Sequence, residues 1–240
     1  MELAAARVKV LSPRALLERL QHRFDVLESE TRDRPPRHRT LREAITWSYE
    51  LLDGQEQALF RRLGVFAGGC TLEAAEGIGG EAVGEAATVL RVLSSLIDKS
   101  LLRHEEEPGG GSRFGMLETI RAYALERLRE SGEEAGTRRL HLDFFVRFTE
   151  GAAQQLTGPD QAAWFDRMAR EHDNLRAAVA FALAERSDAA ARMVAVLCRF
   201  WMARGFVSEG YEWATRTLDA MGQELSPAHR AHLLVGAAML

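Results

Sequence analysis

The sequence is poor in cysteine, in lysine and in long hydrophobic runs, and each shortage excludes a class of protein. Cys70 and Cys198 are its only cysteines, and their wide separation fits neither a disulfide framework nor a metal-binding motif. The longest hydrophobic runs, such as Ala177–Ala184, are too short to span a bilayer. No basic segment followed by an apolar one begins at Met1, as a secretory signal would require. We therefore expect a cytoplasmic protein with reduced thiols.

The shortage of lysine bears on nucleotide binding. Lys9 and Lys99 are the only lysines, and the phosphate-binding loop GxxxxGK[ST] needs a lysine followed by serine or threonine. Lys99 precedes Ser100, but the glycines of the motif are missing. The chain by itself is therefore expected to hold no cofactor and to be no enzyme. His229 and His232 share a predicted helical face, but without further ligands they predict a surface pair and no metal site.

What the sequence does contain is the order of elements that is typical of a winged helix. This domain is expected over residues 39–132, where helices precede a β-hairpin whose tip is Pro108–Gly111. Thr40 and Glu43 have the spacing of a capping box at the start of its first helix. Helices are predicted over residues 41–52, 53–63, 72–76 and 81–99, a short strand over 64–66, and hairpin strands over 101–105 and 112–116.

From residue 133 onward the hydrophobic pattern predicts helices and no strands. From Asp188 the helix pairs recur at about 38 residues, close to the period of tetratricopeptide arrays. Residues 133–240 are thus predicted to form a tetratricopeptide-like helical repeat domain, so the chain as a whole is expected to be mainly α. The apolar segment Leu233–Val235 near the end has no polar cap, which predicts a truncated array. The expected helices cover residues 137–155, 160–170, 172–185, 188–204, 206–221 and 227–240.

The aromatic residues of the repeat region have two interpretations. Trp201, Tyr211 and Trp213 are candidates for the lining of a concave ligand groove. Their helical spacing is also typical of a repeat core, which we favour. The wider set with both interpretations also contains Trp164, Phe165, Phe200 and Phe206.

Charge disfavours direct DNA binding, although winged helices often bind DNA. The net charge is −4, and affinity for DNA depends on cations that meet phosphates. The predicted third helix has Arg91 and Lys99 as its only cations, and the wing carries three consecutive carboxylates at Glu105–Glu107.

Seven segments spread over nearly the whole chain carry a resemblance to a known family. They are Glu2–Val8, Leu11–Pro13, Arg39–Tyr49, Phe66–Gly69, Leu96–Leu101, Met116–Ala124 and Glu171–Arg176. Together, and in this order, they resemble part of the bacterial STAND-type (NB-ARC-like) regulatory ATPases, a family that includes LuxR- and AfsR-like transcriptional regulators.

The resemblance implies an architecture and a function. An ATPase module comes first, and residues 1–38 would be its helical tail and an arginine-rich linker. A winged helix that closes over bound nucleotide follows, and then repeats that sense a protein partner or a small ligand. ATP or ADP would belong to the longer parent protein. The main alternative is a free-standing tetratricopeptide-like scaffold for protein interactions.

The resemblance also implies candidate nucleotide-sensing residues. Met116, Leu117 and Glu118 fall where related proteins carry a Met-His-Asp motif whose histidine contacts phosphate. Leu117 replaces that histidine and offers no such contact, while Glu118 either lies near the nucleotide or only stabilises its helix. Arg39 either contacts nucleotide or an acidic domain face, or belongs to a solvated linker.

Overall fold

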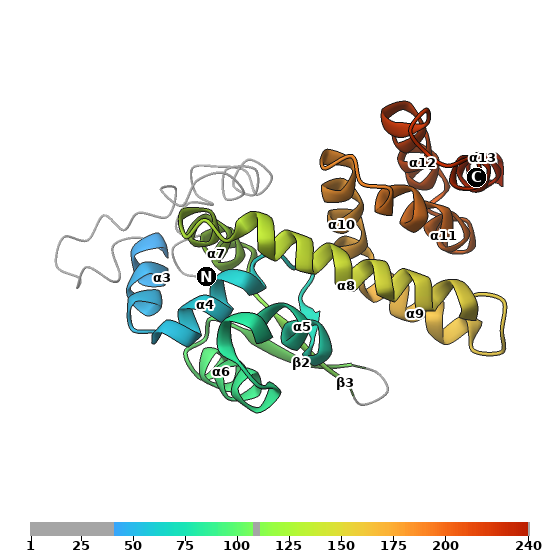
Figure 1. The fold of residues 1–240 in the computed structure, drawn as a ribbon. Helices are drawn as coiled ribbons and strands as arrows, with labels where there is room; N and C mark the ends of the chain where they lie inside the picture. The colour runs from blue at the N-terminus through green and yellow to red at the C-terminus, as the bar shows by residue number, and fades with distance from the viewer. Residues whose placement is uncertain (1–40, 108–110, 240) are drawn as a thin grey trace, which may run out of the picture. The chain divides into compact units, whose positions relative to one another are not determined.

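The computed structural model describes residues 41–107 and 111–239, which form two compact units (Figure 1). The first unit comprises residues 41–65 and 69–134, and the second comprises residues 66–68 and 135–239. Within the described residues there are eleven helices and three short strands, which confirms the mainly α fold class. The predicted helical tail over residues 1–38, Arg39 and the Thr40 cap lie outside the described residues.

The first unit is a winged helix, as predicted. Three helices, α4, α5 and α6, precede the hairpin strands β2 and β3, and α3 and α7 flank this core. The bounds are α3 Leu41–Glu50, α4 Gly54–Leu63, β1 Cys70–Thr71, α5 Leu72–Val83, α6 Ala86–Asp98, β2 Arg103–Glu107, β3 Gly111–Gly115 and α7 Glu118–Glu130. The antiparallel sheet has the order β1-β3-β2, with Phe114 opposite both Cys70 and His104.

Three local predictions in this unit were wrong. Residues 64–66 form a turn and not a strand, and the first strand lies at Cys70–Thr71, where β3 provides a pairing partner. The predicted helix over residues 81–99 is interrupted, because Gly84 adopts a φ of +103° between α5 and α6. The helix that Thr71 caps extends to Val83, well beyond its predicted end at residue 76.

The core of the first unit lies where α4, α6 and α7 meet. Leu59 and Phe60 of α4 are fully buried, and the rings of Phe60 and Tyr123 are 6.4 Å apart. Gly64 permits the close approach of α4 to α7, since a Cβ there would lie 3.0 Å from the Cβ of Ala124. The amphipathic face of α6 completes this core with Val89, Val92, Leu93 and Leu96.

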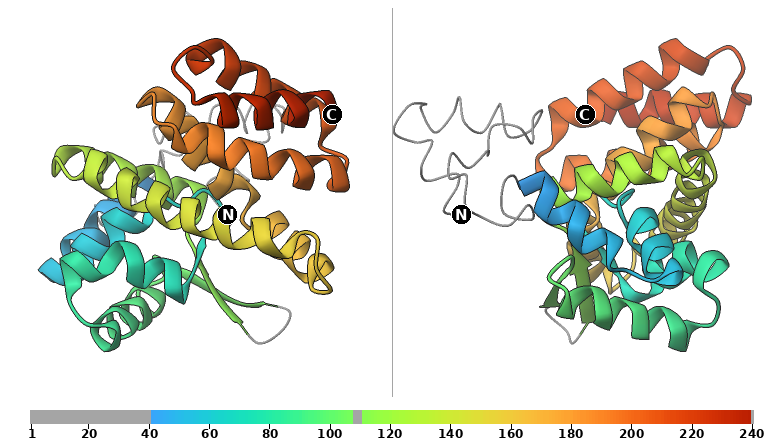
Figure 2. Two further views of the ribbon diagram at one scale, coloured as in Figure 1. Left: turned by 45° about the vertical axis from the view of Figure 1, so that its right-hand side comes forward. Right: turned by 90° about the vertical axis from the view of Figure 1, so that its left-hand side faces the viewer.

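The second unit consists of helices with short connections, and the bounds of these helices agree closely with the predicted ones. α11 packs against α12 and also against α13, and α12 packs against α13. Figure 2 shows α11, α12 and α13 side by side in this unit. The bounds are α8 Glu134–Gln155, α9 Gln161–Arg170, α10 His172–Ala184, α11 Ala189–Arg204, α12 Val207–Met221 and α13 Pro227–Met239.

A glycine sets the spacing of two of these helices. A Cβ on Gly236 of α13 would lie 2.7 Å from the Sγ of Cys198 on α11. Only a hydrogen atom fits at this crossing.

Among the described residues, no helix has both the length and the hydropathy needed to cross a membrane.

Candidate functional site

The face that a winged helix can offer to DNA is formed here by α6 and the β2–β3 hairpin. The exposed side chains of α6 include one cation, Arg91, one anion, Asp98, and the apolar Leu90, which is 48% exposed. Arg103 at the start of the hairpin is followed by the exposed carboxylates of Glu105 and Glu106. This face is therefore neutral to acidic.

Lys99 and Arg91, the two cations that the sequence analysis noted in this region, already contact other side chains of the unit. The Nζ atom of Lys99 lies 2.6 and 2.7 Å from the two carboxylate oxygens of Glu56. The Nη2 atom of Arg91 donates to the Oε1 of Gln55 at 2.9 Å. Contacts with DNA phosphates would compete with these existing contacts.

Glu56 is a buried carboxylate that the sequence analysis did not identify as important. It is 5% exposed, and it accepts hydrogen bonds from Ser95 Oγ at 2.5 Å and from the Asp53 backbone N–H at 2.8 Å. Burial raises the pKa of Glu56, but the bonds from Lys99, Ser95 and Asp53 together hold this pKa below its ordinary value. Glu56 therefore fastens the start of α4 to the end of α6.

The predicted nucleotide-sensing residues lie at the junction between β3 and α7. Met116 is half-buried, and Leu117 precedes α7 with its side chain 43% exposed. The carboxylate of Glu118 accepts two hydrogen bonds from Arg121, at 2.8 and 3.0 Å. Arg121 also donates to the backbone carbonyl of Gly64 at 3.4 Å. Glu118 thus occupies the first turn of its helix with a cationic partner, and its relation to nucleotide stays a prediction.

The segment Glu171–Arg176 forms a buried polar network in the second unit. Asn174 is fully buried, and its Oδ1 accepts from the Ala67 backbone N–H at 2.8 Å while its Nδ2 donates to Glu171 at 2.7 Å. His141 packs between the rings of Phe66 and Phe145. Burial lowers the pKa of His141 to about 4, against a hydrogen bond with Asn174 that raises this pKa. The network explains why residues 66–68 belong to this unit.

The same segment contacts α11 and α12 through His172 and Arg176. The Nε2 atom of His172 accepts from the Nε1 of Trp201 at 3.0 Å and lies 3.1 Å from the Oε1 of Glu209. Arg176 donates to both carboxylate oxygens of Glu209, with an Nε–Oε1 distance of 2.6 Å. Burial lowers the pKa of His172 despite the nearby Glu209, so the ring is neutral at pH 7 and can accept from the Trp201 indole.

The predicted groove residues have different environments. Trp201 is 1% exposed and belongs to the core, so its ring lines no open groove. Tyr211 is 56% exposed on α12. Trp213 is half-buried, and the guanidinium of Arg216 lies 4.6 Å from its ring centroid. A role for Tyr211 and Trp213 in a groove stays a prediction.

The described part of the chain has no cluster of side chains suited to a metal ion, and its two cysteines are buried. No group of three or more histidine, cysteine, aspartate or glutamate side chains is arranged to hold a metal ion there. Cys70 and Cys198 are free and buried. Burial raises the pKa of Cys198 to about 11, so its thiol is protonated at neutral pH.

Comparison with known proteins supports the class of the first unit. A family model described as a winged helix-turn-helix domain matches residues 52–129. These bounds include α4 to β3 and nearly all of α7. The first unit is thus a winged helix-turn-helix domain by sequence as well as by structure.

The curated relatives are longer proteins from mycobacteria. The putative HTH-type transcriptional regulators Rv0890c of Mycobacterium tuberculosis (strain ATCC 25618 / H37Rv) and Mb0914c of Mycobacterium bovis are each 35% identical over 247 residues, which covers 100% of this chain and 27% of each relative. The uncharacterized protein Rv0894 of M. tuberculosis is 38% identical over 134 residues, 55% of this chain and 34% of that protein. The chain therefore spans about a quarter of the length of the first two relatives. No solved structure matches it significantly.

Proposed function

We propose that the chain is the winged-helix and helical-repeat portion of a STAND-type regulatory ATPase. In this role it couples the nucleotide state of an upstream ATPase module to the binding of a ligand or partner by the repeats. The observation that carries the proposal is the face of α6 and the hairpin. Its exposed apolar Leu90 and its neutral-to-acidic charge suit contact with protein better than contact with DNA.

The second unit supports the repeat part of the proposal. The packing of α11 against both following helices is typical of stacked helical pairs. Two ion pairs, Arg186–Glu224 and Arg204–Asp166, each join residues that are 38 positions apart. This separation agrees with the period in the sequence, as expected when equivalent positions of neighbouring repeats meet.

The relatives support a regulatory role. Rv0890c and Mb0914c carry the description of putative HTH-type transcriptional regulators, and this chain covers only 27% of each. That difference in length leaves room for an ATPase module and an output domain in a parent of similar size. In this proposal ATP or ADP binds to the parent, while the chain itself is no catalyst and holds no cofactor.

Direct binding of DNA by α6 is the second candidate function. The match to a winged helix-turn-helix model and the descriptions of the relatives favour it. The paired state of Lys99 and Arg91 and the carboxylates of the wing disfavour it. A free-standing repeat scaffold is a third possibility, which would need no nucleotide at all.

Hydrogen exchange in the full-length parent tests the coupling. Exchange is measured by mass spectrometry with saturating ADP and with a non-hydrolysable ATP analogue, and binding of each nucleotide is verified separately. We expect exchange at residues 112–121, which include the Met116–Glu118 junction, to differ between the two states. Peptides from the buried part of α6 serve as the control and should not change. Identical exchange in both states, or a parent without a phosphate-binding loop, would contradict the proposal.

A further inference from the structure

His172, the first residue of α10, lies against the turn that joins α11 to α12. The residue is 8% exposed. Its ring centroid lies 5.2 Å from that of Phe200 on α11 and 4.7 Å from that of Phe206, which immediately precedes α12. His172 therefore contacts both sides of this turn, and a change in its hydrogen bonds acts on the connection between the two helices.

One nitrogen of the His172 ring faces two partners with opposite requirements. Nε2 lies 3.0 Å from the Nε1 atom of Trp201, an indole nitrogen that can only donate a hydrogen bond. The same Nε2 lies 3.1 Å from the Oε1 atom of Glu209, a carboxylate oxygen that can only accept one. An Nε2 atom without a proton satisfies Trp201, whereas an Nε2 atom with a proton satisfies Glu209. The two hydrogen bonds therefore exclude each other.

Both partners are held in place by the fold. Trp201 is 1% exposed within the core of the second unit. The side chain of Glu209 is 21% exposed, and its Oε1 atom accepts from the Nε of Arg176 at 2.6 Å. A buried indole N–H that loses its acceptor is unfavourable, because water does not replace the lost bond. The position of one proton on His172 therefore decides whether α10 is tied to α11 at this point.

The surroundings of His172 set the pH range in which the ring takes up its proton. Burial lowers the pKa of His172 below its ordinary value of 6.5. Among the charged groups that face the ring, Glu209 of α12 and Asp173 of α10 favour the protonated form, and Arg176 of α10 opposes it. α11 faces the ring with two uncharged aromatic side chains. Protonation therefore takes place below pH 6.5.

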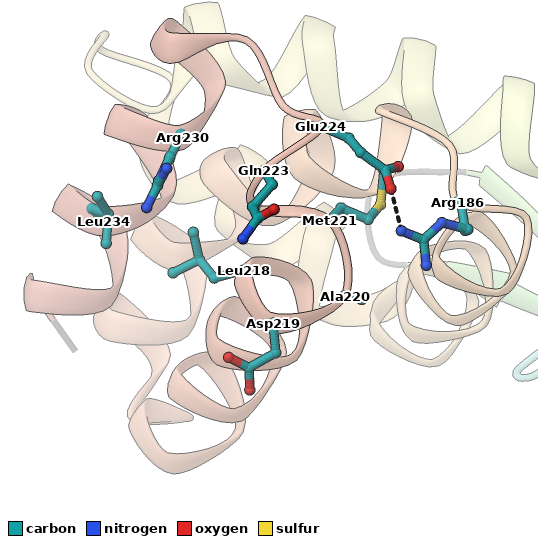
Figure 3. A pocket seen from close by; sticks show the side chains of 10 residues that line it. Arg186, Leu218, Asp219, Ala220, Met221, Gln223, Glu224, Arg230 and Leu234 are labelled. Carbon is teal, nitrogen blue, oxygen red and sulfur yellow. Dashed lines mark hydrogen bonds and ion pairs between the residues drawn. The ribbon is translucent and has the colours of Figure 1, made fainter.

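An exposed ion pair of the same unit offers a contrast. Arg186 pairs with Glu224 at the edge of a pocket of about 530 Å³ between α12 and α13 (Figure 3). Their side chains are 56% and 57% exposed, and a guanidinium keeps its proton at any pH at which proteins are folded. This pair joins a permanent donor to an acceptor, so the uptake of a proton by the cation offers it no second arrangement.

We infer that His172 is a proton-operated switch among α10, α11 and α12. Without a proton on Nε2, the ring accepts from Trp201 and ties α10 to α11. With a proton there, the ring donates to Glu209, and the Trp201 indole loses its acceptor. Acid thus replaces a bond to α11 by a bond to α12 and loosens the turn between these helices. The switch lies within the second unit and needs no nucleotide, so it can be tested on the chain alone.

NMR of the ¹⁵N-labelled chain, titrated from about pH 8 to about pH 4, tests the switch. At the start we expect the ring ¹⁵N shifts of His172 to show no proton on Nε2. On acidification, the His172 ring and the Trp201 indole signals should change together, with one common pKa below 6.5. The indole signal of Trp164, which lies against Arg167 on α9, is the internal control and should not follow His172.

Three observations in this titration would overturn the inference. They are a proton on Nε2 of His172 at neutral pH, an indole signal of Trp201 that does not follow the His172 ring, and unfolding of the second unit before His172 takes up a proton. His172→Gln has no titrating ring, so the change of the Trp201 signal should be absent from this variant. A change that persists in His172→Gln would assign the response to another group.

Two further variants separate the switch from a general loosening of the fold. Glu209→Gln removes the carboxylate that favours the protonated ring, so the pKa of His172 should fall further. Trp201→Phe removes the donor that favours the neutral ring, so this pKa should rise. General loosening would hydrate the ring and raise the pKa in both variants, which would overturn the inference. Glu212→Gln, at an exposed position of α12, is the matched control and should leave the titration of His172 unchanged.

Discussion

Replacing Glu56 by alanine is the sharpest test of how the winged helix is held together. The substitution leaves Lys99, the Ser95 hydroxyl and the Asp53 N–H without their shared acceptor. Breaking a buried ion pair costs about 3–5 kcal/mol, but Lys99 is 36% exposed and can be hydrated in part. The lost capping box adds about 1 kcal/mol. We expect the free energy of unfolding of the first unit to fall by about 2–4 kcal/mol, since water offsets part of the loss.

Urea denaturation with hydrogen-exchange readout measures this effect, because peptides from each unit can be followed separately. The midpoint for peptides of α4 and α6 should fall by about 1–2 M, given m values of about 1–3 kcal/mol/M. Glu50→Ala, at an exposed position of α3, is the matched control and should change stability by less than about 0.5 kcal/mol. Equal midpoints for the Glu56 and Glu50 variants would show that Glu56 does not hold α4 and α6 together.

The same residue predicts a dependence on pH with a definite sign. The pKa of Glu56 is lower in the folded protein than its ordinary value of 4.5. Its contribution to stability is therefore present above pH 4.5 and is lost as the pH falls through the lower folded value. Glu56→Ala should lose this part of the acid dependence of the first unit.

Three further predictions concern the second unit. Gly236→Ala should destabilise this unit by about 1–3 kcal/mol, because the added methyl group would overpack against Cys198. Gly136→Ala, in open space on α8, should instead stabilise it by up to about 1 kcal/mol. Thermal melting of the two variants measures the difference. Trp201→Ala should cost about 3–5 kcal/mol, and a near-wild-type melting curve would contradict the buried position of this ring. The pKa of His141 falls from 6.5 to about 4 on folding, so acidification from pH 6.5 to 4 should cost about 3 kcal/mol at ~1.4 kcal/mol per pKa unit. His141→Gln should flatten that profile in urea titrations at several pH values.

Local signals in the sequence were sufficient to predict most of the helices. Asp53 and Thr71 begin α4 and α5 by accepting hydrogen bonds from backbone N–H groups, as their residue types predict. Glycine signals were more ambiguous. Gly79 lies inside α5 because it packs against Leu59, while Gly84 ends that helix with a positive φ. The difference depends on a tertiary contact that no local pattern contains.

The neutral-to-acidic face of the winged helix could be predicted, because Arg91, Lys99 and Glu105–Glu107 are visible as charges in sequence. The partners of these charges could not be predicted from the sequence. Lys99 meets Glu56 from 43 positions away, and Asn174 meets the Ala67 N–H from 107 positions away. The pocket of about 530 Å³ between α12 and α13 was also not predicted. A left-handed φ at Arg186 is a property of the folded turn and has no signal in residue type, since arginine is common in helices.

Titration of fluorescent duplex DNA with the chain, followed by anisotropy, tests most directly the claim that this winged helix contacts protein and not DNA. We expect a Kd weaker than about 100 µM at physiological salt, beyond the range of ordinary non-specific binding. Replacing Glu105 and Glu106 by lysine should create measurable binding and shows that the assay can detect it. Submicromolar binding by the wild-type chain that weakens steeply with salt and is lost in Arg91→Gln would show that α6 binds DNA.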